Sequence, residues 1–431
     1  MKTKIMYDVT MLLYAGSKDA GRTGIYWVVY NVAHILNKNK NVKLMFYISP
    51  DQNKNFKNII KNYLPEFKNV KIWPHRNFFD DVINFYGALK QFAKNENHKV
   101  MAECFHIIAL FSKFLFFAPR KIVRLINKNI NADVFLSPMF KVPDILEKNT
   151  KIKRYTILYD IIPFLFPKYY KLDENSVHNT WLGILIKFMK TNNTDKYFAI
   201  SESTAKDFMK MAPSLKPDQM IVTPLACSDA FHPCSREQTI AALKKYNLPT
   251  DKKYVFSLCS LEPRKNLIRA VKTFVQFIKK NKIDDMVFIM GGAHWEQFIG
   301  SLEQEINDLG DYKDKIIKAG YIDDEDLAPL YSGAEWFVYT SQYEGFGLPP
   351  LEAMQCGTPV ITSNNSSLPE VVGDAGVMID WDNDEQHIES YEKYYFDRKY
   401  RDKMATAGLK RAKEFSWEKT VDIMLQEILK K

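Results

Sequence analysis

The chain has 431 residues, which is more than one ordinary hydrophobic core accommodates and predicts at least two domains. The hydrophobic fraction of 46% and the charged fraction of 26% exclude a disordered chain and fit a globular protein. The formal net charge of +9 would suit nucleic acid, an anionic membrane or a phosphorylated substrate alike. The five cysteines are scattered without a Cys-x-x-Cys pair, which argues against a disulfide framework or a zinc site and favours a reducing compartment.

The first half of the chain alternates short apolar runs with longer helical patterns. The run at the start is broken by Asp8 and predicts a strand rather than a signal peptide. A helix is expected to follow it in TGIYWVVYNVAHIL, after a loop that holds Gly21 and Gly24 but lacks the G-x-G-x-x-G dinucleotide pattern. Strands are predicted at residues 4–12, 42–49, 70–74, 132–137, 154–160, 196–200 and 220–224.

One aromatic stretch raises the question of membrane contact. The run from Cys104 to Pro119 is shorter than the roughly 18–20 residues that span a bilayer, so no transmembrane helix is expected. Over residues 104–128 the apolar run leads into a basic segment, a pattern typical of a helix lying in an anionic membrane surface. A core helix followed by a solvated basic helix fits the same pattern. The basic side chains are Arg120, Lys121, Arg124 and Lys128.

The stretch YTILYDIIPFLFPKYY places a carboxylate at the end of a predicted strand. Asp160 follows the strand, and Pro163 and Pro167 then interrupt regular structure. A carboxylate at the carboxyl end of a parallel strand is suited to face a ligand cleft. A turn-forming aspartate is the alternative explanation.

The second half shows a clean alternation of strands and helices. Its apolar strands are separated by helical patterns such as NLIRAVKTFVQFIKK, which predicts a parallel sheet covered on both faces. The polar segment 226–252 is the preferred linker between this half and the first. Two doubly wound units would then face a cleft with the carboxyl ends of their strands. The predicted strands are residues 254–260, 286–292, 316–322, 334–340, 359–364 and 376–380.

Two motifs in the second half are suited to bind a phosphorylated ligand. In SLEPRKNL, Arg264 and Lys265 follow a strand and precede a helix, where they could clamp a diphosphate, although basic loop residues are usually solvated. In YEGFGLPPLEAMQCG, a glycine loop leads into a helix N-terminus, which favours an anion. Glu344 and Glu352 could each hold sugar hydroxyls. Alternatively, Glu352 only complements the helix dipole and Glu344 is solvated.

These motifs resemble the retaining glycosyltransferases of family 4. SQYEGFGLPPLEAMQCGTPVITSNNSSLPEVVGDAG is similar to the family's donor-binding signature, EPRKNL to its phosphate motif and TGIYWVVYNVAHIL to its first glycine loop. Weaker landmarks are ADVFLSP, LYDIIPFLFPKYY, FAISESTAKDF and VTPLACSDAFHP. The resemblance implies an α/β GT-B fold of two Rossmann-like domains. Its expected parts are an acceptor domain at 1–235, a nucleotide-sugar domain at 236–405 and a final helix at 406–431 that crosses back.

The resemblance also implies roles for individual residues. Asp160 would lie near the reacting carbon, Arg264 and Lys265 would neutralise the diphosphate, and Glu344 would contact the donor sugar. The residues expected to bind the rest of the donor are Gly24 at the diphosphate, Tyr321 and Ile322 at the base, the amides of Gly345, Phe346, Gly347 and Leu348 at the sugar and phosphate, and Glu352 at the ribose. Two departures are that Tyr159 stands where the family often has histidine, and that LACSDAF lacks the common Asn-Gly.

The expected function is therefore the retaining transfer of a hexose from a GDP- or UDP-linked donor to a glycan or lipid-linked acceptor in surface polysaccharide synthesis. A small glycoside or disaccharide product is the alternative. No metal or cofactor is expected, and the Asp-x-Asp runs at 324–326 and 382–384 are interpreted as surface acids. Nucleic acid is not expected as a partner, because paired carboxylates in a cleft would repel its phosphate backbone. The expected location is the cytoplasm, on the inner face of the plasma membrane.

Overall fold

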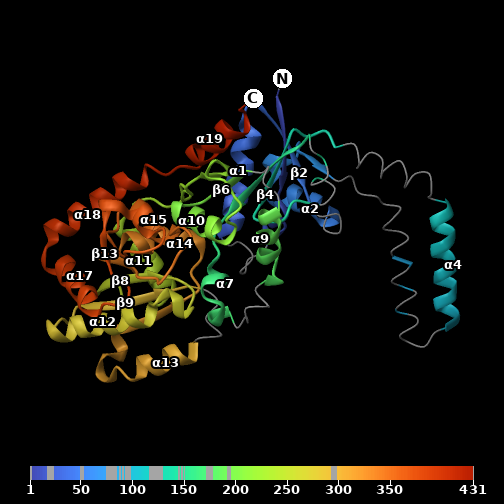
Figure 1. Cartoon of the computed structure of the whole chain (residues 1–431). Coiled ribbons are helices and arrows are strands. Elements are labelled where there is room, and N and C mark those ends of the chain that lie inside the picture. Colours follow the sequence, from blue (N-terminus) through green and yellow to red (C-terminus); the bar gives the residue numbers. More distant parts are fainter. Residues whose placement is uncertain are drawn as a thin grey trace. The chain divides into compact units, whose positions relative to one another are not determined.

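The computed structural model describes most of the chain in two compact units (Figure 1). One unit consists of Met1–Pro138 with Val142–Tyr155, and the other of Met139–Lys141 with Thr156–Lys431. The described residues are 2–16, 24–48, 53–73, 85–86, 89, 92, 99–115, 130–143, 146, 149, 151–170, 178–191, 196–292 and 299–430. None of the helices in these ranges is long and apolar enough to cross a membrane.

The first sheet follows the strand pattern predicted for the first half. Its order is β3-β2-β1-β4-β5-β6-β7, and its pairs with a defined register are parallel. Helix α1 (Gly24–Lys38) connects the first two strands, as predicted. The strands are β1 (Thr3–Asp8), β2 (Val42–Tyr47), β3 (Lys71–Trp73), β4 (Val134–Pro138), β5 (Lys153–Leu158), β6 (Lys196–Ala199) and β7 (Met220–Val222).

The first strand is shorter than its predicted range of 4–12. The carboxylate of Asp8 accepts hydrogen bonds from the amide of Thr10 at 3.0 Å and from its hydroxyl at 2.7 Å. This local turn ends the strand, and the 3-10 helix η1 (Thr10–Tyr14) follows. The prediction was wrong here because a short polar contact overrides an apolar pattern.

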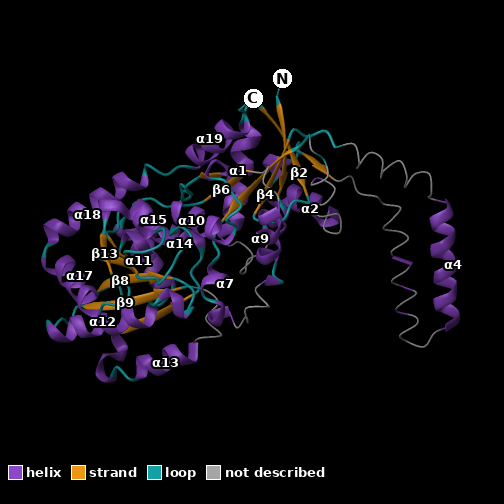
Figure 2. Cartoon of the chain, viewed as in Figure 1, coloured by secondary structure: helices purple, strands orange, loops and turns teal. Residues whose placement is uncertain are grey.

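The second sheet lies entirely in the second unit. Its order is β10-β9-β8-β11-β12-β13, all parallel. Figure 2 shows α12 (Leu267–Lys280) along one side of β8 and β9. All six predicted strands are present. They are β8 (Lys253–Leu258), β9 (Met286–Gly291), β10 (Ile316–Gly320), β11 (Trp336–Tyr339), β12 (Val360–Ser363) and β13 (Val377–Ile379).

Helices cover the second sheet. Their apolar residues recur with the helical period, so these residues form one face that packs against the sheet. One apolar stripe of α12 is buried: Leu267, Val271, Phe274, Val275 and Ile278. The predicted linker segment 226–252 is not a simple loop, because a capping box at Ser235 starts a helix within it. The other helices of this half are α11 (Arg236–Lys245), α13 (Ile299–Asn307), α14 (Asp324–Ser332), α15 (Leu348–Gln355), α16 (Leu368–Val372) and α17 (Asp384–Phe396).

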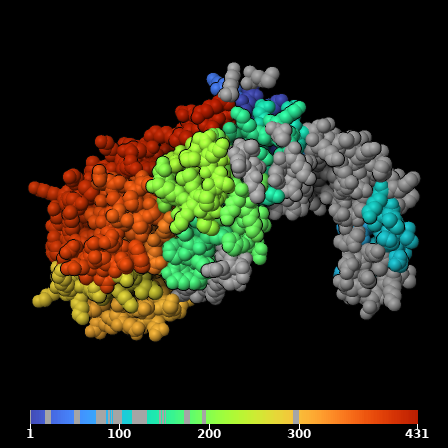
Figure 3. Space-filling view, in the orientation of Figure 1, coloured from blue at the N-terminus to red at the C-terminus, as the bar shows by residue number. Residues whose placement is uncertain are grey.

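The chain ends in α18 (Arg398–Ala412) and α19 (Trp417–Ile428), which lie on the surface of the second unit (Figure 3). The Ser416 hydroxyl accepts from the amide of Lys419 at 3.2 Å, so Ser416 is the N-cap of α19. The Thr420 hydroxyl donates to the carbonyl of Pro224 at 2.5 Å. The final helix thus contacts the segment after β7, while the boundaries at 235 and 405 stay predictions.

Candidate active site

The basic pair is presented by a sharp turn after β8. Pro263 starts the short 3-10 helix η5 (Pro263–Lys265), and Asn266 then adopts a left-handed conformation with φ of 58°. The side chain of Asn266 donates to the carbonyls of Thr340 at 3.1 Å and Trp381 at 2.6 Å. Asparagine tolerates this backbone conformation well, so the turn is fixed before α12 begins.

Glu344 is the centre of a buried ion cluster at this turn. Its Oε1 accepts from Lys265 Nζ at 2.8 Å and from Arg264 Nη1 at 3.0 Å. Arg264 Nη2 also donates to Glu262 at 3.1 Å, and Lys265 Nζ to the hydroxyl of Tyr339 at 2.7 Å. The structure therefore brings together three residues that were predicted as separate contacts to the diphosphate and the sugar.

The charges of this cluster fix the protonation of its members. Burial raises the pKa of the Glu344 carboxyl, but Lys265 and Arg264 outweigh burial and lower the pKa to about 2. Burial opposes the charge of Arg264, yet Glu344 and its neighbours raise the pKa of the guanidinium. Arg264 is only 5% exposed, and its buried Nε has no hydrogen-bond partner among the described residues. One buried donor of the cluster is therefore left unsatisfied by the described residues.

The glycine loop presents free backbone donors beside this cluster. Gly347 has φ of 119°, a conformation that favours glycine, and it directly precedes α15. Pro349 and Pro350 occupy the first turn of α15, where a missing N–H costs no helical hydrogen bond. The amides of Gly345, Phe346 and Gly347 make no hydrogen bond to any residue that the structure describes. Unpaired amides before a helix N-terminus form an anion-binding geometry.

Asp160 lies against the glycine loop. A β-carbon added at Gly345 would lie 2.9 Å from Asp160 Cβ, 2.9 Å from the Tyr159 carbonyl oxygen and 3.1 Å from Asp160 Oδ2. The other oxygen of Asp160, Oδ1, accepts from the amide of Ile162 at 3.0 Å. Burial raises the pKa of Asp160, and the Ile162 amide and the charge of Arg264 oppose this shift without cancelling it. Glycine at 345 is thus required by close approach.

Glu352 lies one turn into the adjacent helix, and its partner is a tyrosine. Its Oε2 accepts from the hydroxyl of Tyr331 in α14 at 2.9 Å. Burial raises the pKa of Glu352 to about 7, although the hydrogen bond from Tyr331 lowers it. Glu352 therefore titrates near neutral pH, whereas Glu344 remains ionised.

The replacement Glu352→Gln is expected to change how stability depends on pH. A carboxyl whose pKa rises from 4.5 to about 7 on folding destabilises the protein progressively as the pH increases through that window. The melting temperature of the variant, relative to that of the wild type, should therefore increase between about pH 4.5 and pH 7. Above pH 7 the difference between the two melting temperatures should stay constant. Thermal unfolding measured at intervals from pH 4 to 8 tests this. A difference independent of pH would contradict it.

Comparison with known proteins identifies the family. Residues 239–411, which contain the ion cluster, the glycine loop and Glu352, match the family model described as "Glycosyl transferases group 1". The chain is 32% identical over 291 residues to O-antigen chain mannosyltransferase B of Escherichia coli. That alignment covers 66% of this chain and 71% of the relative. The chain belongs to the group 1 glycosyltransferases.

Solved structures agree on the fold of this glycosyltransferase. Sucrose-phosphate synthase from Thermosynechococcus elongatus superposes with a TM-score of 0.62 at 16% identity, covering 99% of this chain and 98% of that one. WaaG, a glycosyltransferase involved in lipopolysaccharide biosynthesis, gives a TM-score of 0.61 at 12% identity, with both chains covered completely. The predicted GT-B class of two parallel-sheet, Rossmann-like domains is therefore confirmed.

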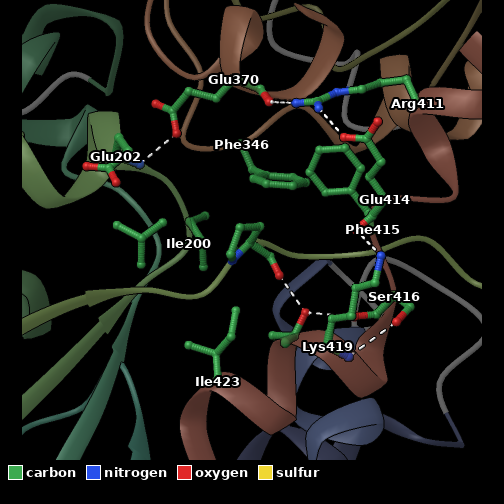
Figure 4. Close-up of a pocket in the computed structure, with 13 residues that line it drawn as sticks. Ile200, Glu202, Phe346, Glu370, Arg411, Glu414, Phe415, Ser416, Lys419 and Ile423 are labelled. Carbon is green, nitrogen blue, oxygen red and sulfur yellow. Dashed lines mark hydrogen bonds and ion pairs between the residues drawn. The ribbon is translucent and has the colours of Figure 1, made fainter. Parts of the chain in front are cut away.

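The other expected donor-binding positions have different surroundings. Gly24 opens α1 in the first unit. Tyr321 and Ile322 directly follow β10; Tyr321 is exposed, whereas Ile322 is buried against Gly291. The side chain of Phe346 turns towards Phe415 and lines a cavity of about 380 Å³ (Figure 4). The side chain of Phe346 thus faces this cavity, whereas the sequence prediction concerns its backbone amide.

Several residues of the candidate site were missed by the sequence prediction. Glu262 and Tyr339 complete the ion cluster, and Ser201 and Thr204 contact the glycine loop. Glu262 lies within the EPRKNL motif and could have been chosen there as a partner of Arg264. The pairing of Ser201 with a residue 144 positions away has no local signal.

The two acidic runs pair with basic side chains. Lys245 Nζ lies within hydrogen-bonding distance of Asp323 at 2.9 Å and of Asp326 at 2.5 Å. In the second run, Arg269 Nη1 donates to Asp384 at 2.6 Å. A basic side chain thus already neutralises part of each cluster.

Proposed function

We propose that this glycosyltransferase is a retaining enzyme of family 4. It transfers a hexose, mannose in the first instance, from a GDP- or UDP-linked donor to a glycan or lipid-linked acceptor in surface polysaccharide synthesis. The observation that carries the proposal is the buried Arg264–Lys265–Glu344 cluster beside the glycine loop, whose amides at residues 345–347 have no partner among the described residues. Similarity to an O-antigen chain mannosyltransferase supports the sugar and the pathway class.

The proposed chemistry assigns the fixed cations to the leaving group. As the bond between sugar and diphosphate breaks, negative charge grows on the diphosphate, and Arg264 and Lys265 stabilise it without reorganising. The amides of residues 345–348 bind the phosphate and sugar. Glu344 remains ionised and accepts hydrogen bonds from hydroxyls of the sugar. The cation charge replaces that of a metal, so transfer proceeds without one.

The remaining groups complete the donor site in this proposal. Glu352 binds the ribose hydroxyls, Tyr321 and Ile322 face the base, and Gly24 approaches the diphosphate. The acceptor attacks on the face from which the diphosphate leaves, and a donor phosphate oxygen takes the acceptor proton. Asp160, which contacts the glycine loop, lies near the reacting carbon.

A small glycoside is the second candidate product. Structural likeness to sucrose-phosphate synthase, over 99% of this chain, keeps this alternative open. The two candidates differ in the acceptor and share the donor chemistry. Incubation with a donor and either free monosaccharide phosphates or a saccharide-lipid extract distinguishes them by where the labelled sugar appears.

Helix α4 (Lys99–Leu115) supports a membrane-bound acceptor. It exposes large apolar side chains, including Ile107, Ile108 and Leu110, which a helix buried in a core would not do. We propose that α4 lies in an anionic membrane surface at the cytoplasmic face. The basic residues Arg120, Lys121, Arg124 and Lys128 of the same prediction lie outside the described residues.

The variant Ile107→Asp tests this membrane contact. We expect the wild type to float with vesicles of anionic lipid and the variant to stay largely in the soluble fraction, because a charge in the apolar face opposes insertion. Phe396→Asp is the matched control, since Phe396 is equally exposed, at 63% against 61%, but lies in α17. A wild type that never floats, or equal loss in both variants, would refute membrane binding through α4.

A direct experiment on the donor tests the proposed function. A bound nucleotide sugar raises the melting temperature by mass action. We expect a larger rise with either GDP- or UDP-linked hexoses than with the free sugars, and release of the matching diphosphate once an acceptor is present. If neither class of donor shifts the melting temperature nor is consumed, the proposal is wrong.

A further inference from the structure

A buried pair of hydroxyls joins the glycine loop to the segment that carries Asp160. Ser201 is the N-cap of α10 (Glu202–Met211), and its Oγ donates to the carbonyl of Gly345 at 2.8 Å. The Oγ1 of Thr204 donates to the carbonyl of Tyr159 at 2.8 Å and lies 3.2 Å from the carbonyl of Gly345. Both side chains are almost wholly excluded from solvent, so water does not compete for these bonds.

A carboxylate from α16 (Leu368–Val372) in turn holds the start of α10. The Glu370 carboxylate, in α16, accepts from the amides of Glu202 at 2.6 Å and Ser203 at 2.8 Å, and Figure 4 shows it directed at Glu202. A carboxylate at a helix N-terminus is favoured by the unpaired amides and by the helix dipole. The guanidinium of Arg411 donates to the carbonyl of Glu370 at 2.6 Å and so anchors the acid's backbone.

These contacts all act on the spacing between Gly345 and Asp160. Gly345 and Asp160 are close enough that a single added methyl group would clash, and Thr204 bonds the carbonyl of the residue before Asp160. Loss of the Thr204 hydroxyl would leave the Tyr159 carbonyl without this bond and release one side of the contact. None of these groups belongs to the Arg264–Lys265–Glu344 cluster that binds the leaving group in the proposed reaction.

We infer that Ser201 and Thr204, supported by Glu370, are positioning residues that set the spacing between Asp160 and the donor-binding glycine loop. The inference rests on the proposed glycosyl transfer. It assigns the hydroxyls to the geometry of the reacting centre rather than to affinity for the donor. A misplacement of about 1 Å at a reacting centre can slow a reaction about 10²-fold.

The variant Thr204→Val tests this role, since valine keeps the branched shape and removes only the hydroxyl. We expect kcat for sugar transfer to fall about 10- to 100-fold while the donor KM stays within about twofold of the wild type. Thr204→Ser should restore most of the rate, because it returns the hydroxyl. Thr239→Val is the matched control: Thr239 is also buried, and its hydroxyl donates to the carbonyl of Pro329 at 3.1 Å, away from the site.

The outcomes separate the inference from the proposed function. If the wild type transfers sugar and Thr204→Val has an unchanged kcat, the positioning role is overturned while the proposed function stands. An equal loss in Thr239→Val, or a loss that serine does not repair, overturns the positioning role as well. A wild type that consumes no nucleotide sugar refutes the proposed function. If Thr204→Val does not fold, Glu370→Gln takes its place, and an unchanged kcat there overturns the inference equally.

Discussion

Replacement of Arg264 by alanine is expected to reduce sugar transfer about 10²- to 10³-fold, the range typical for removal of one fixed group that stabilises transition-state charge. The guanidinium lies in the cluster proposed to face the leaving diphosphate, and its Nε is already desolvated without a partner among the described residues. Because the charge on the leaving group grows during the reaction, kcat should fall more than donor affinity. Steady-state kinetics with a saturating acceptor measures both.

The fold of this variant should persist because no carboxylate is left alone. Glu344 keeps Lys265 at 2.8 Å, and Glu262 keeps the hydroxyls of Ser260 and Tyr170, each at 3.0 Å. Arg269→Ala is the matched control, since Arg269 pairs with Asp384 at the surface. Transfer by Arg264→Ala within threefold of the wild type would contradict the diphosphate clamp, and equal losses in both variants would show a general effect.

The second large effect is expected for Gly345→Ala. The new β-carbon would lie 2.9 Å from two atoms, Asp160 Cβ and the Tyr159 carbonyl oxygen, so the loop or the Asp160 segment must move. That displacement should reduce transfer about 10²-fold while the variant still binds nucleotide, because the cations of the cluster are untouched. Transfer rates and nucleotide-induced thermal shifts measured on the same preparation test both parts.

Gly300→Ala serves as the control for this replacement. Gly300 lies in α13, and a β-carbon there would meet no atom within 4 Å, so transfer should be unchanged. Full activity in Gly345→Ala would show that the close contact with Asp160 plays no part in the reaction. If the variant loses both nucleotide binding and activity, the defect lies in donor binding, which contradicts the predicted effect on the reacting centre.

The sequence predicted the sheets well because strands buried on both faces have continuous apolar runs. Strand ends were less predictable: the hydrogen bonds of Asp8 with Thr10 stop β1 four residues before its expected end. Likewise, the helix in the polar segment 226–252 depends on a capping box at Ser235 rather than on hydrophobic periodicity.

The sequence proposed the residues of the candidate site one by one, whereas it did not predict the contacts between them. Motif position placed Arg264 and Lys265 at the same sheet edge as the glycine loop. That both cations would bond one oxygen of Glu344, 80 and 79 residues away, is a tertiary fact without a local pattern. The same holds for Thr204, whose partners at Tyr159 and Gly345 lie in separate elements.

The most direct test of the account is the stereochemistry of transfer in the presence of a metal chelator. The purified chain is incubated with GDP-mannose, or with the donor that gives the largest thermal shift, and a mannose-terminated saccharide. The anomeric configuration of the new linkage is then read by nuclear magnetic resonance. We predict release of the nucleoside diphosphate and a product that keeps the configuration of the donor. An inverted linkage, or activity that disappears with the chelator, would contradict the proposed mechanism.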